Sequence, residues 1–208
     1  MKKIFFAAAL VAITGLVSSA QTSTPDRIGN MKVDKFQKKN EKGNQKVTAI
    51  TPSDGTANET DKQLMMQIAM GGMKQLMVSQ AVVAKATNPK VKMLAQSEVD
   101  EQTGVSNKLK ELAAAKGVTL PAAPDAETER LVAQAKSLSG TQLDQFYLSE
   151  SGVKGHQQLQ ATMETVASTA NLKELRKLAG ATLPVIRMHL EVSQAEMNMM
   201  GNGASAQR

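Results

Sequence analysis

The sequence predicts an all-α protein folded as an antiparallel four-helix bundle. From residue 60 onward, apolar side chains recur at 3.6-residue spacing in four long segments, which is the pattern of amphipathic helices. Helix-start signals precede these segments, and turn residues separate them. No segment shows the alternation typical of a half-buried strand. Helices of this length joined mostly by short loops pack as a bundle, and together they can bury one core.

The first two helices have clear sequence boundaries. Thr60 and Gln63 fit a capping box at the start of the first helix, which we expect to run to about Ala86. Asn88, followed directly by a proline, predicts the N-cap and first position of the second helix. Gly117 predicts the end of that helix, since glycine is the usual residue just beyond a helix C-terminus.

A longer connection, residues 117–140, separates the second and third helices. It contains two prolines, and we expect a short extra helix within it at about residues 125–136. The third helix is predicted to begin at another capping box, Thr141 with Asp144, and to run to about Ala170.

The fourth helix is predicted to run from Asn171 to about Met199, with Glu174 completing its start signal. Pro184 lies inside this segment. Because proline lacks a backbone N–H and clashes with the preceding turn, we expect it to kink the helix or to split off a first segment that ends near Ala181.

The N-terminus has the pattern of a secretory signal peptide at residues 1–20. Two lysines precede an apolar run at residues 4–17, and small residues then allow cleavage after Ala20. The run is too short for a stable membrane anchor, and later segments are interrupted by polar residues, so we expect no membrane span. This pattern predicts a protein of the periplasm or outer envelope.

Residues 21–59 and 201–208 are predicted to be disordered, so the bundle domain is expected to span residues 60–200. The 21–59 segment is rich in Lys, Gln, Asn, Thr and Gly and shows no sustained period. Such a Lys-rich tail could contact anionic envelope components electrostatically or serve only as a solvated spacer. Its basic residues are Arg27, Lys32, Lys35, Lys38, Lys39, Lys42 and Lys46.

Composition argues against several classes of function. The chain has no cysteine, so it is neither a disulfide scaffold nor a lipoprotein acylated at the cleavage site. Aromatic residues make up 2% and tryptophan is absent, which leaves no platform for base stacking; we therefore expect no nucleic-acid partner. The chain also contains no Gly-x-Ser-x-Gly elbow and no glycine-rich phosphate loop. These absences favour a non-enzymatic protein and do not define its oligomeric state.

Polar residues interrupt the apolar stripes of the predicted helices. His156 and His189, the two histidines of the chain, lie on the inward stripes of the third and fourth helices, and Glu98 lies on that of the second. Two imidazoles and a carboxylate could hold one Zn²⁺-like ion inside a bundle. Gln75 and Gln102 stand at comparable inward positions, and no Glu-x-x-His pair accompanies the histidines, so a buried hydrogen-bonded layer is the competing interpretation.

Methionines are concentrated in the first helix, where four share one face: Met66, Met70, Met73 and Met77. Thioethers bind Cu(I), which makes copper binding one hypothesis for this face. The alternative is an adaptable apolar surface that packs in the core or against a partner.

A series of short motifs connects the chain with a known family. The motifs are Lys85-Ala86-Thr87-Asn88-Pro89, Leu112-Ala113-Ala114-Ala115-Lys116-Gly117-Val118, Leu120-Pro121, Leu138-Ser139-Gly140, Asp144 with Tyr147, Gly155-His156-Gln157, Leu183-Pro184 and His189-Leu190. Through them, residues 60–197 resemble the bacterial exported family called domain of unknown function 4142, whose members are often labelled outer-membrane and ferritin-like. The resemblance implies a ferritin-like four-helix bundle. It also implies a glutamate in place of Gln75 and a histidine in place of Gln102 in most members, and so a weakened metal site here.

Two hypotheses for function follow. The first is an exported, non-enzymatic helical-bundle protein that acts as a binding or stress-related module of the bacterial envelope. The second is a storage protein for iron, zinc or copper, or a metal-dependent oxidoreductase, with a divalent metal held by His156, His189 and Glu98 in the bundle core. The glutamines at positions 75 and 102 favour the first hypothesis.

Overall fold

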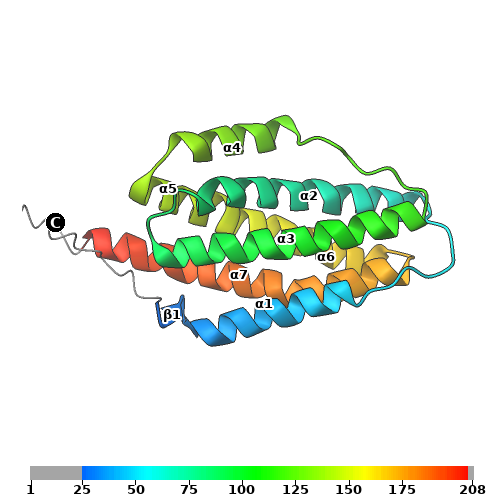
Figure 1. The fold of residues 1–208 in the computed structure, drawn as a ribbon, viewed down its shortest axis with the longest axis horizontal. Coiled ribbons are helices and arrows are strands. Elements are labelled where there is room, and N and C mark those ends of the chain that lie inside the picture. Colours follow the sequence, from blue (N-terminus) through cyan, green and yellow to red (C-terminus); the bar gives the residue numbers. More distant parts are fainter. Residues whose placement is uncertain (1–24, 206–208) are drawn as a thin grey trace, which may run out of the picture.

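A computed structural model describes residues 25–205 of the chain, so the predicted signal peptide lies outside the described residues. The described part is all-α, as predicted, apart from an antiparallel hairpin with two residues in each strand. Its helices lie side by side along one long axis (Figure 1). The elements are β1 (Arg27–Ile28), β2 (Met31–Lys32), α1 (Val33–Thr48), α2 (Glu59–Val83), α3 (Pro89–Ala115), α4 (Ala126–Ser137), α5 (Gly140–Tyr147), the π-helix η1 (Leu148–Gly155), α6 (His156–Thr169) and α7 (Lys173–Ser205).

Helices α2 and α3 form an antiparallel pair joined by a short turn. The start of α2 differs from the prediction, because Asn58 is its N-cap: the Asn58 side chain accepts a hydrogen bond from the backbone N–H of Asp61 at 2.8 Å. The capping box therefore joins Asn58 and Asp61, not Thr60 and Gln63. Asn88 caps α3 as predicted, accepting from the N–H of Lys90 at 2.9 Å.

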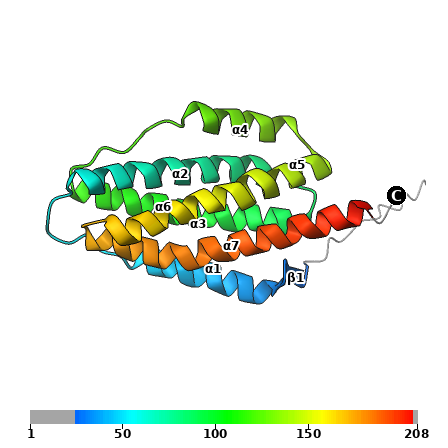
Figure 2. The ribbon, with the colours of Figure 1, turned by 180° about the vertical axis from the view of Figure 1, so that it is seen from behind.

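The third predicted helix is one long helical run made of α5, η1 and α6. It begins at Gly140 after the N-cap Ser139, and the expected capping box at Thr141 is wrong because the Asp144 carboxylate is engaged elsewhere. It accepts hydrogen bonds from the Thr87 hydroxyl at 2.8 Å and the Asn88 N–H at 3.0 Å, tying this helix to the α2–α3 turn. The predicted short helix is also present, as α4, which runs along the outside of α2 (Figure 2).

The last helix, α7, continues without a break through Pro184, so the predicted split near Ala181 is wrong. Pro184 is exposed, and so is Gly180, whose carbonyl would otherwise accept the missing N–H. That carbonyl therefore lies on the water side of the helix while the opposite side stays packed. The helix also extends to Ser205, so residues 201–205, expected to be disordered, are helical; residues 206–208 lie outside the described part.

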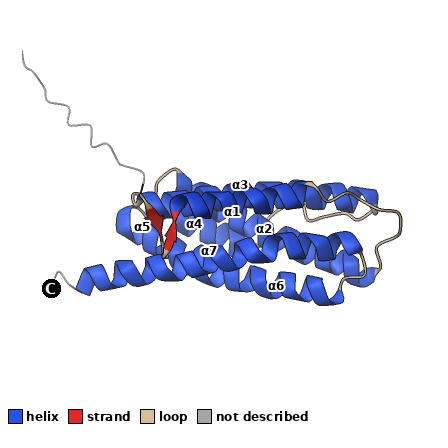
Figure 3. Ribbon diagram, turned by 90° about the horizontal axis from the view of Figure 1, so that it is seen from below, coloured by secondary structure: helices blue, strands red, loops and turns tan. Residues whose placement is uncertain are grey.

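The largest departure from the prediction lies in residues 27–48, which are ordered rather than a disordered tail. They form the β1–β2 hairpin followed by α1, which packs against α3 and α7 (Figure 3). Ile28 and Phe36 are fully buried. The inward stripe of α1 contains an asparagine and a glycine, which made its period hard to recognise. Gly43 is required there, because a Cβ would lie 2.4 Å from the Val185 Cγ2. The domain therefore begins well before residue 60.

Apolar residues fill the interior as two clusters with a polar layer between them. On α3, Val91, Leu94 and Ala95 belong to one cluster, whereas the residues from Val105 onward belong to the other. The stretch between them carries buried polar side chains, beginning with Glu98. The candidate site lies in this layer, midway along the helices. None of the described helices combines the length and hydropathy needed to cross a membrane.

Candidate metal centre

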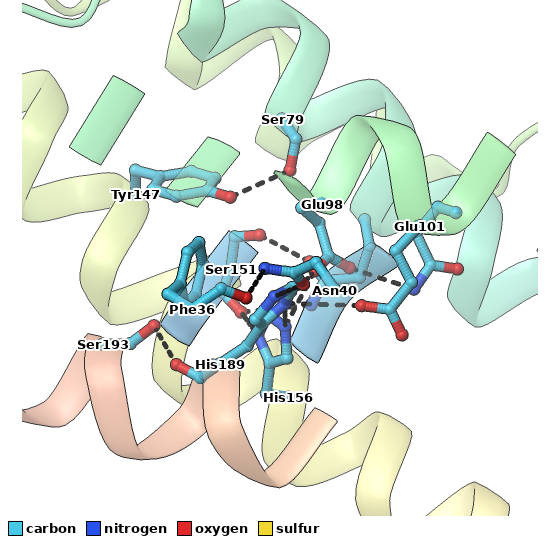
Figure 4. Close-up of polar contacts among 12 residues, drawn as sticks. Phe36, Asn40, Ser79, Glu98, Glu101, Tyr147, Ser151, His156, His189 and Ser193 are labelled. Atoms are coloured by element: carbon cyan, nitrogen blue, oxygen red, sulfur yellow. Dashed lines mark hydrogen bonds and ion pairs between the residues drawn. The ribbon is translucent and has the colours of Figure 1, made fainter. Parts of the chain in front are cut away.

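Glu98, His156 and His189, predicted from three different helices, meet at one point in the core (Figure 4). Oε2 of Glu98 lies 2.9 Å from Nε2 of His156 and 3.0 Å from Nδ1 of His189. The two imidazole nitrogens are 3.3 Å apart. All three side chains are fully buried. The three positions inferred from helical periodicity are therefore buried and lie close together, and their role as metal ligands stays a prediction.

The outer nitrogen of each imidazole faces an acceptor, which determines where its proton lies. Nδ1 of His156 is 2.9 Å from the carbonyl oxygen of Ser151, which can only accept. Nε2 of His189 is 2.6 Å from Oδ1 of Asn40, and the Asn40 amide nitrogen donates to the carbonyl of Phe36 at 3.0 Å. Both outer nitrogens therefore donate. In the neutral imidazoles, the inner nitrogens then turn their lone pairs toward Glu98.

Burial and neighbouring charge shift the pKa values in opposite directions. Burial raises the pKa of Glu98, but the charges and hydrogen bonds of the two histidines outweigh it and hold this pKa far below its usual range. Burial lowers the pKa of His156, but the Glu98 carboxylate more than compensates and raises it. For His189 burial prevails and the pKa is lowered. The cluster therefore favours one positive charge next to Glu98, from a proton on His156 or from a cation.

Glu101 is a fourth member of the cluster that the sequence analysis missed. It lies one helical turn after Glu98, is 3% exposed, and its Oε2 is 3.4 Å from Nδ1 of His189. Among the described residues, neither of its carboxyl oxygens has a hydrogen-bond partner. Burial and the charge of Glu98 raise its pKa well above the usual value. A buried carboxyl without a donor is costly, so its position next to the histidines requires an explanation.

Gln75 and Gln102, the positions at which the family resemblance implied a glutamate and a histidine, both border the cluster. Gln102 donates from Nε2 to Oε1 of Glu98 at 3.0 Å. Gln75 donates to the Ser151 carbonyl at 3.1 Å and accepts from the Ser151 hydroxyl at 2.6 Å. Gln102 thus contacts the glutamate directly, whereas Gln75 reaches the cluster through the residue that positions His156.

The π-helix η1 explains how His156 is oriented. Backbone hydrogen bonds in a π-helix span five residues, and Ser151 lies five residues before His156, so its carbonyl oxygen reaches the imidazole as well. Gly155 permits the close packing of η1 against α2, because a Cβ there would come 2.4 Å from Nε2 of Gln75. Single π-turns are frequent at functional sites. Nothing in the sequence analysis indicated this one.

The sequence does not single out Asn40, because it lies in the segment predicted to be a disordered tail. It lies on the inward side of α1, next to Phe36, whose ring is 5.4 Å from that of His189. The signal was present in the sequence as Val33, Phe36, Asn40, Gly43 and Val47, a set at helical spacing. Only three of these residues are large and apolar, so the stripe did not stand out.

The methionine face of α2 is separate from this cluster. Met66 is exposed, and Met70, Met73 and Met77 are half-buried. Met73 and Leu76 line a cleft of about 310 Å³ between α2, α3 and the loop after α3. The copper hypothesis for this face remains a prediction.

The fold and the buried cluster define an all-α protein with a Glu-His-His group in its core. The family described as a domain of unknown function (DUF4142) matches residues 46–195, which is most of the chain, and the protein belongs to this family. The match includes Glu98, Glu101, His156 and His189 but begins after Asn40. No curated protein and no solved structure matches the chain.

Proposed function

We propose that the protein is an exported, non-enzymatic helical-bundle protein of the bacterial envelope that binds one divalent transition-metal ion in its core. Glu98, His156 and His189 are the ligands, and Glu101 is the fourth donor. One observation carries this proposal: two imidazole lone pairs and a carboxylate are directed at a single point, beside a second carboxyl that has no other partner.

The spacing of the donor atoms supports an ion of the size and preference of zinc. Four N and O donors at zinc-ligand distance in a tetrahedron lie about 3.3–3.4 Å from one another. Four of the six distances among the donor atoms of this cluster are 2.9, 3.0, 3.3 and 3.4 Å. A cation here would also accept the lone pair of each histidine and give Glu101 a partner. Imidazole and carboxylate donors suit Zn²⁺, and also Fe²⁺ and Cu²⁺.

Burial favours binding over catalysis. The three central side chains have no exposed surface, and Glu101 is nearly as buried. Structural metal sites are closed by four protein ligands, whereas catalytic sites keep a position open for water or substrate. A ligand set of two histidines and two glutamates with no solvent-facing position is of the closed kind. This is why we prefer a binding protein to an oxidoreductase.

The compartment and the finer fold belong to the same proposal. The signal-peptide pattern at residues 1–20 supports export to the periplasm or outer envelope. Side chains from α3, α6 and α7 that meet midway along the helices are typical of metal sites in ferritin-like bundles. In this chain α1 is added to the four helices of that arrangement and contributes Asn40 next to His189.

Zinc titration of the metal-stripped protein tests the proposal. We expect one Zn²⁺ bound per chain by calorimetry. We also expect zinc to raise the midpoint temperature of unfolding. The free energy of unfolding should increase by about 2.7 kcal/mol when free zinc is a hundredfold above Kd. The variant His156→Gln/His189→Gln keeps polar side chains in the layer and should lose both effects. If zinc and chelator give the same melting curve for the unmodified protein, the cluster is a hydrogen-bonded layer and the proposal is wrong.

A gain-of-binding variant sharpens this test. Gln102→His, combined with Gln75→Glu, restores the residues that the family resemblance implied, and the new imidazole would lie where Gln102 now contacts Glu98. We expect this variant to bind zinc more tightly than the parent. Equal and negligible binding by both proteins would count against a metal site in this layer.

A further inference from the structure

The outer side of α1 carries a row of lysines at regular spacing. Lys32, Lys35, Lys39, Lys42 and Lys46 follow one another at alternating intervals of three and four residues, and all are exposed. Lys32 is the N-cap residue of α1. At 100° and 1.5 Å per residue, the four lysines inside the helix fall within an arc of about 60° and extend over about 17 Å. We refer to these five residues as the lysine row. It lies beside the buried stripe of α1 and is not part of it.

The lysine row is not neutralised by the rest of the described chain. None of the five ammonium groups forms an ion pair with a described residue. The two acidic residues of α1, Asp34 and Glu41, lie more than about 100° around the helix from the middle of the row. Glu41 instead lines the cleft between α1 and α3. The lysine row therefore contains no acidic residue of α1, and Lys38 lies between the row and Asp34.

Neighbouring cations widen the row into a patch along the α1–α7 side. Lys177 of α7 and Lys46 line the same shallow recess at one end. At the other end Arg27, Lys32 and Lys35 line a recess that also contains one carboxylate, Glu191. The patch is therefore about two helices wide, which a flat partner can cover more completely than a single thread-like polymer.

A suitable partner carries negative charge and can be bound without inserting apolar side chains of the protein into it. The large exposed apolar side chains of the described chain are Met66, Met197 and Met199, and none lies on α1. The described aromatic side chains, Phe36, Phe146 and Tyr147, are buried and offer no surface on which nucleic-acid bases could stack. A surface of lipid phosphates attracts lysines by charge alone and presents anions in two dimensions.

We propose that the lysine row docks the protein, through charge alone, on the surface of a bilayer that contains anionic phospholipid. This contact uses a side of α1 other than the one that carries Asn40, and it involves none of the proposed metal ligands.

Sedimentation of the protein with vesicles tests this contact. Vesicles of phosphatidylcholine and phosphatidylglycerol in equal parts should carry the protein into the pellet, and vesicles of phosphatidylcholine alone should not. Each lysine near an anionic surface contributes roughly a fivefold factor, so Lys35→Gln/Lys39→Gln/Lys42→Gln should weaken partitioning by about a hundredfold. High salt should release the unmodified protein, because these exposed charges are screened.

The matched control is Lys92→Gln/Lys110→Gln/Lys136→Gln, which removes the same charge from exposed positions on α3 and α4. It should partition within about twofold of the unmodified protein. Glutamine is a good helix former, and helical circular dichroism of both variants should match that of the parent. Equal losses in the two variants, salt-resistant pelleting, or binding of soluble polyphosphate without binding of vesicles would overturn the assignment.

Discussion

Two buried glutamates on different helices show how a completed polar cluster differs from an incomplete one. Glu174, near the start of α7, accepts two hydrogen bonds of 2.7 Å from the Ser53 N–H and hydroxyl, and its Oε1 is 3.4 Å from the Lys116 ammonium. Every group around it is a fixed donor. Glu98, in the middle of α3, faces two imidazoles whose outer nitrogens already donate elsewhere. Gln102 donates to the other carboxylate oxygen, but the two imidazoles present lone pairs to Glu98 unless a proton or a cation is added.

The difference separates a structural contact from a candidate ligand site. Glu174 holds the loop before α2 against the end of α3 and needs nothing further. The Glu98 cluster contains Glu101, a second carboxyl with no hydrogen-bond partner among the described residues. Burial alone is therefore a poor indicator of function in this protein. The useful indicator is whether the donors and acceptors within the cluster match one another.

The largest expected effect comes from removing the centre of the incomplete cluster. Glu98→Ala leaves two histidines and Gln102 without their shared partner, and it should lower the free energy of unfolding by about 4 kcal/mol. Denaturant unfolding with and without Zn²⁺ measures this. The variant should also lose zinc stabilisation. A variant that zinc still stabilises would show that Glu98 is not a ligand.

The contribution of Glu174 to the free energy of unfolding should depend on pH. Burial raises the pKa of Glu174, but the hydrogen bonds from Ser53 and the contact with Lys116 outweigh it and lower the pKa from 4.5 to about 2. Its stabilising contribution is therefore complete above about pH 4.5 and is lost as pH falls toward 2, amounting to about 3 kcal/mol. Glu174→Gln should unfold more easily than the parent at neutral pH and equally at pH 2. A constant difference across this range would contradict the prediction.

Glu101 should give opposite results in two measurements. Replacing it with leucine removes a buried carboxyl without a partner, so Glu101→Leu should raise the unfolding free energy of the metal-free protein by about 1 kcal/mol. The same change removes the fourth donor, so zinc affinity should fall about tenfold or more. If the leucine variant is less stable without metal, then Glu101 has a structural partner and the comparison with Glu174 fails.

The smallest expected effect tests the outer contact to His189. Asn40→Ala removes the acceptor for Nε2 and should weaken zinc binding about tenfold, the size of effect found for groups that orient metal ligands. Asn40→Asp keeps an acceptor and should retain binding. Gln37→Ala, an exposed change one turn earlier on α1, is the matched control and should leave the affinity unchanged.

One pattern, helical periodicity, predicts both the long helices and three of the buried residues in the candidate site. Apolar side chains at helical spacing mark the inward face, so polar side chains on that face must also point inward. This reasoning places His156, His189 and Glu98 on the inward faces of their helices. The same reasoning did not identify Glu101, because a carboxylate one turn after Glu98 could equally have pointed to solvent.

Other features depend on tertiary contacts that local patterns do not encode. The segment containing α1 has low average hydropathy, and its helix is stabilised by burying Phe36 between α3 and α7. The expected capping boxes at Thr60 and Thr141 failed because Asn58 and Ser139 start the helices earlier, which is a common error at helix ends. No pattern in the sequence predicts the π-helix before His156.

The position of α1 connects a contact with the core and a contact with the surroundings, made on two different sides of one helix. Its inner side holds Asn40 against His189, and its outer side carries the lysine row. Any contact that keeps α1 in place also keeps the outer proton acceptor of His189 in place. Thermodynamic linkage is reciprocal. The factor by which fixing α1 raises the affinity of His189 for an ion equals the factor by which the bound ion favours this position of α1. A charged surface and a buried ion would thus act as effectors of each other without touching.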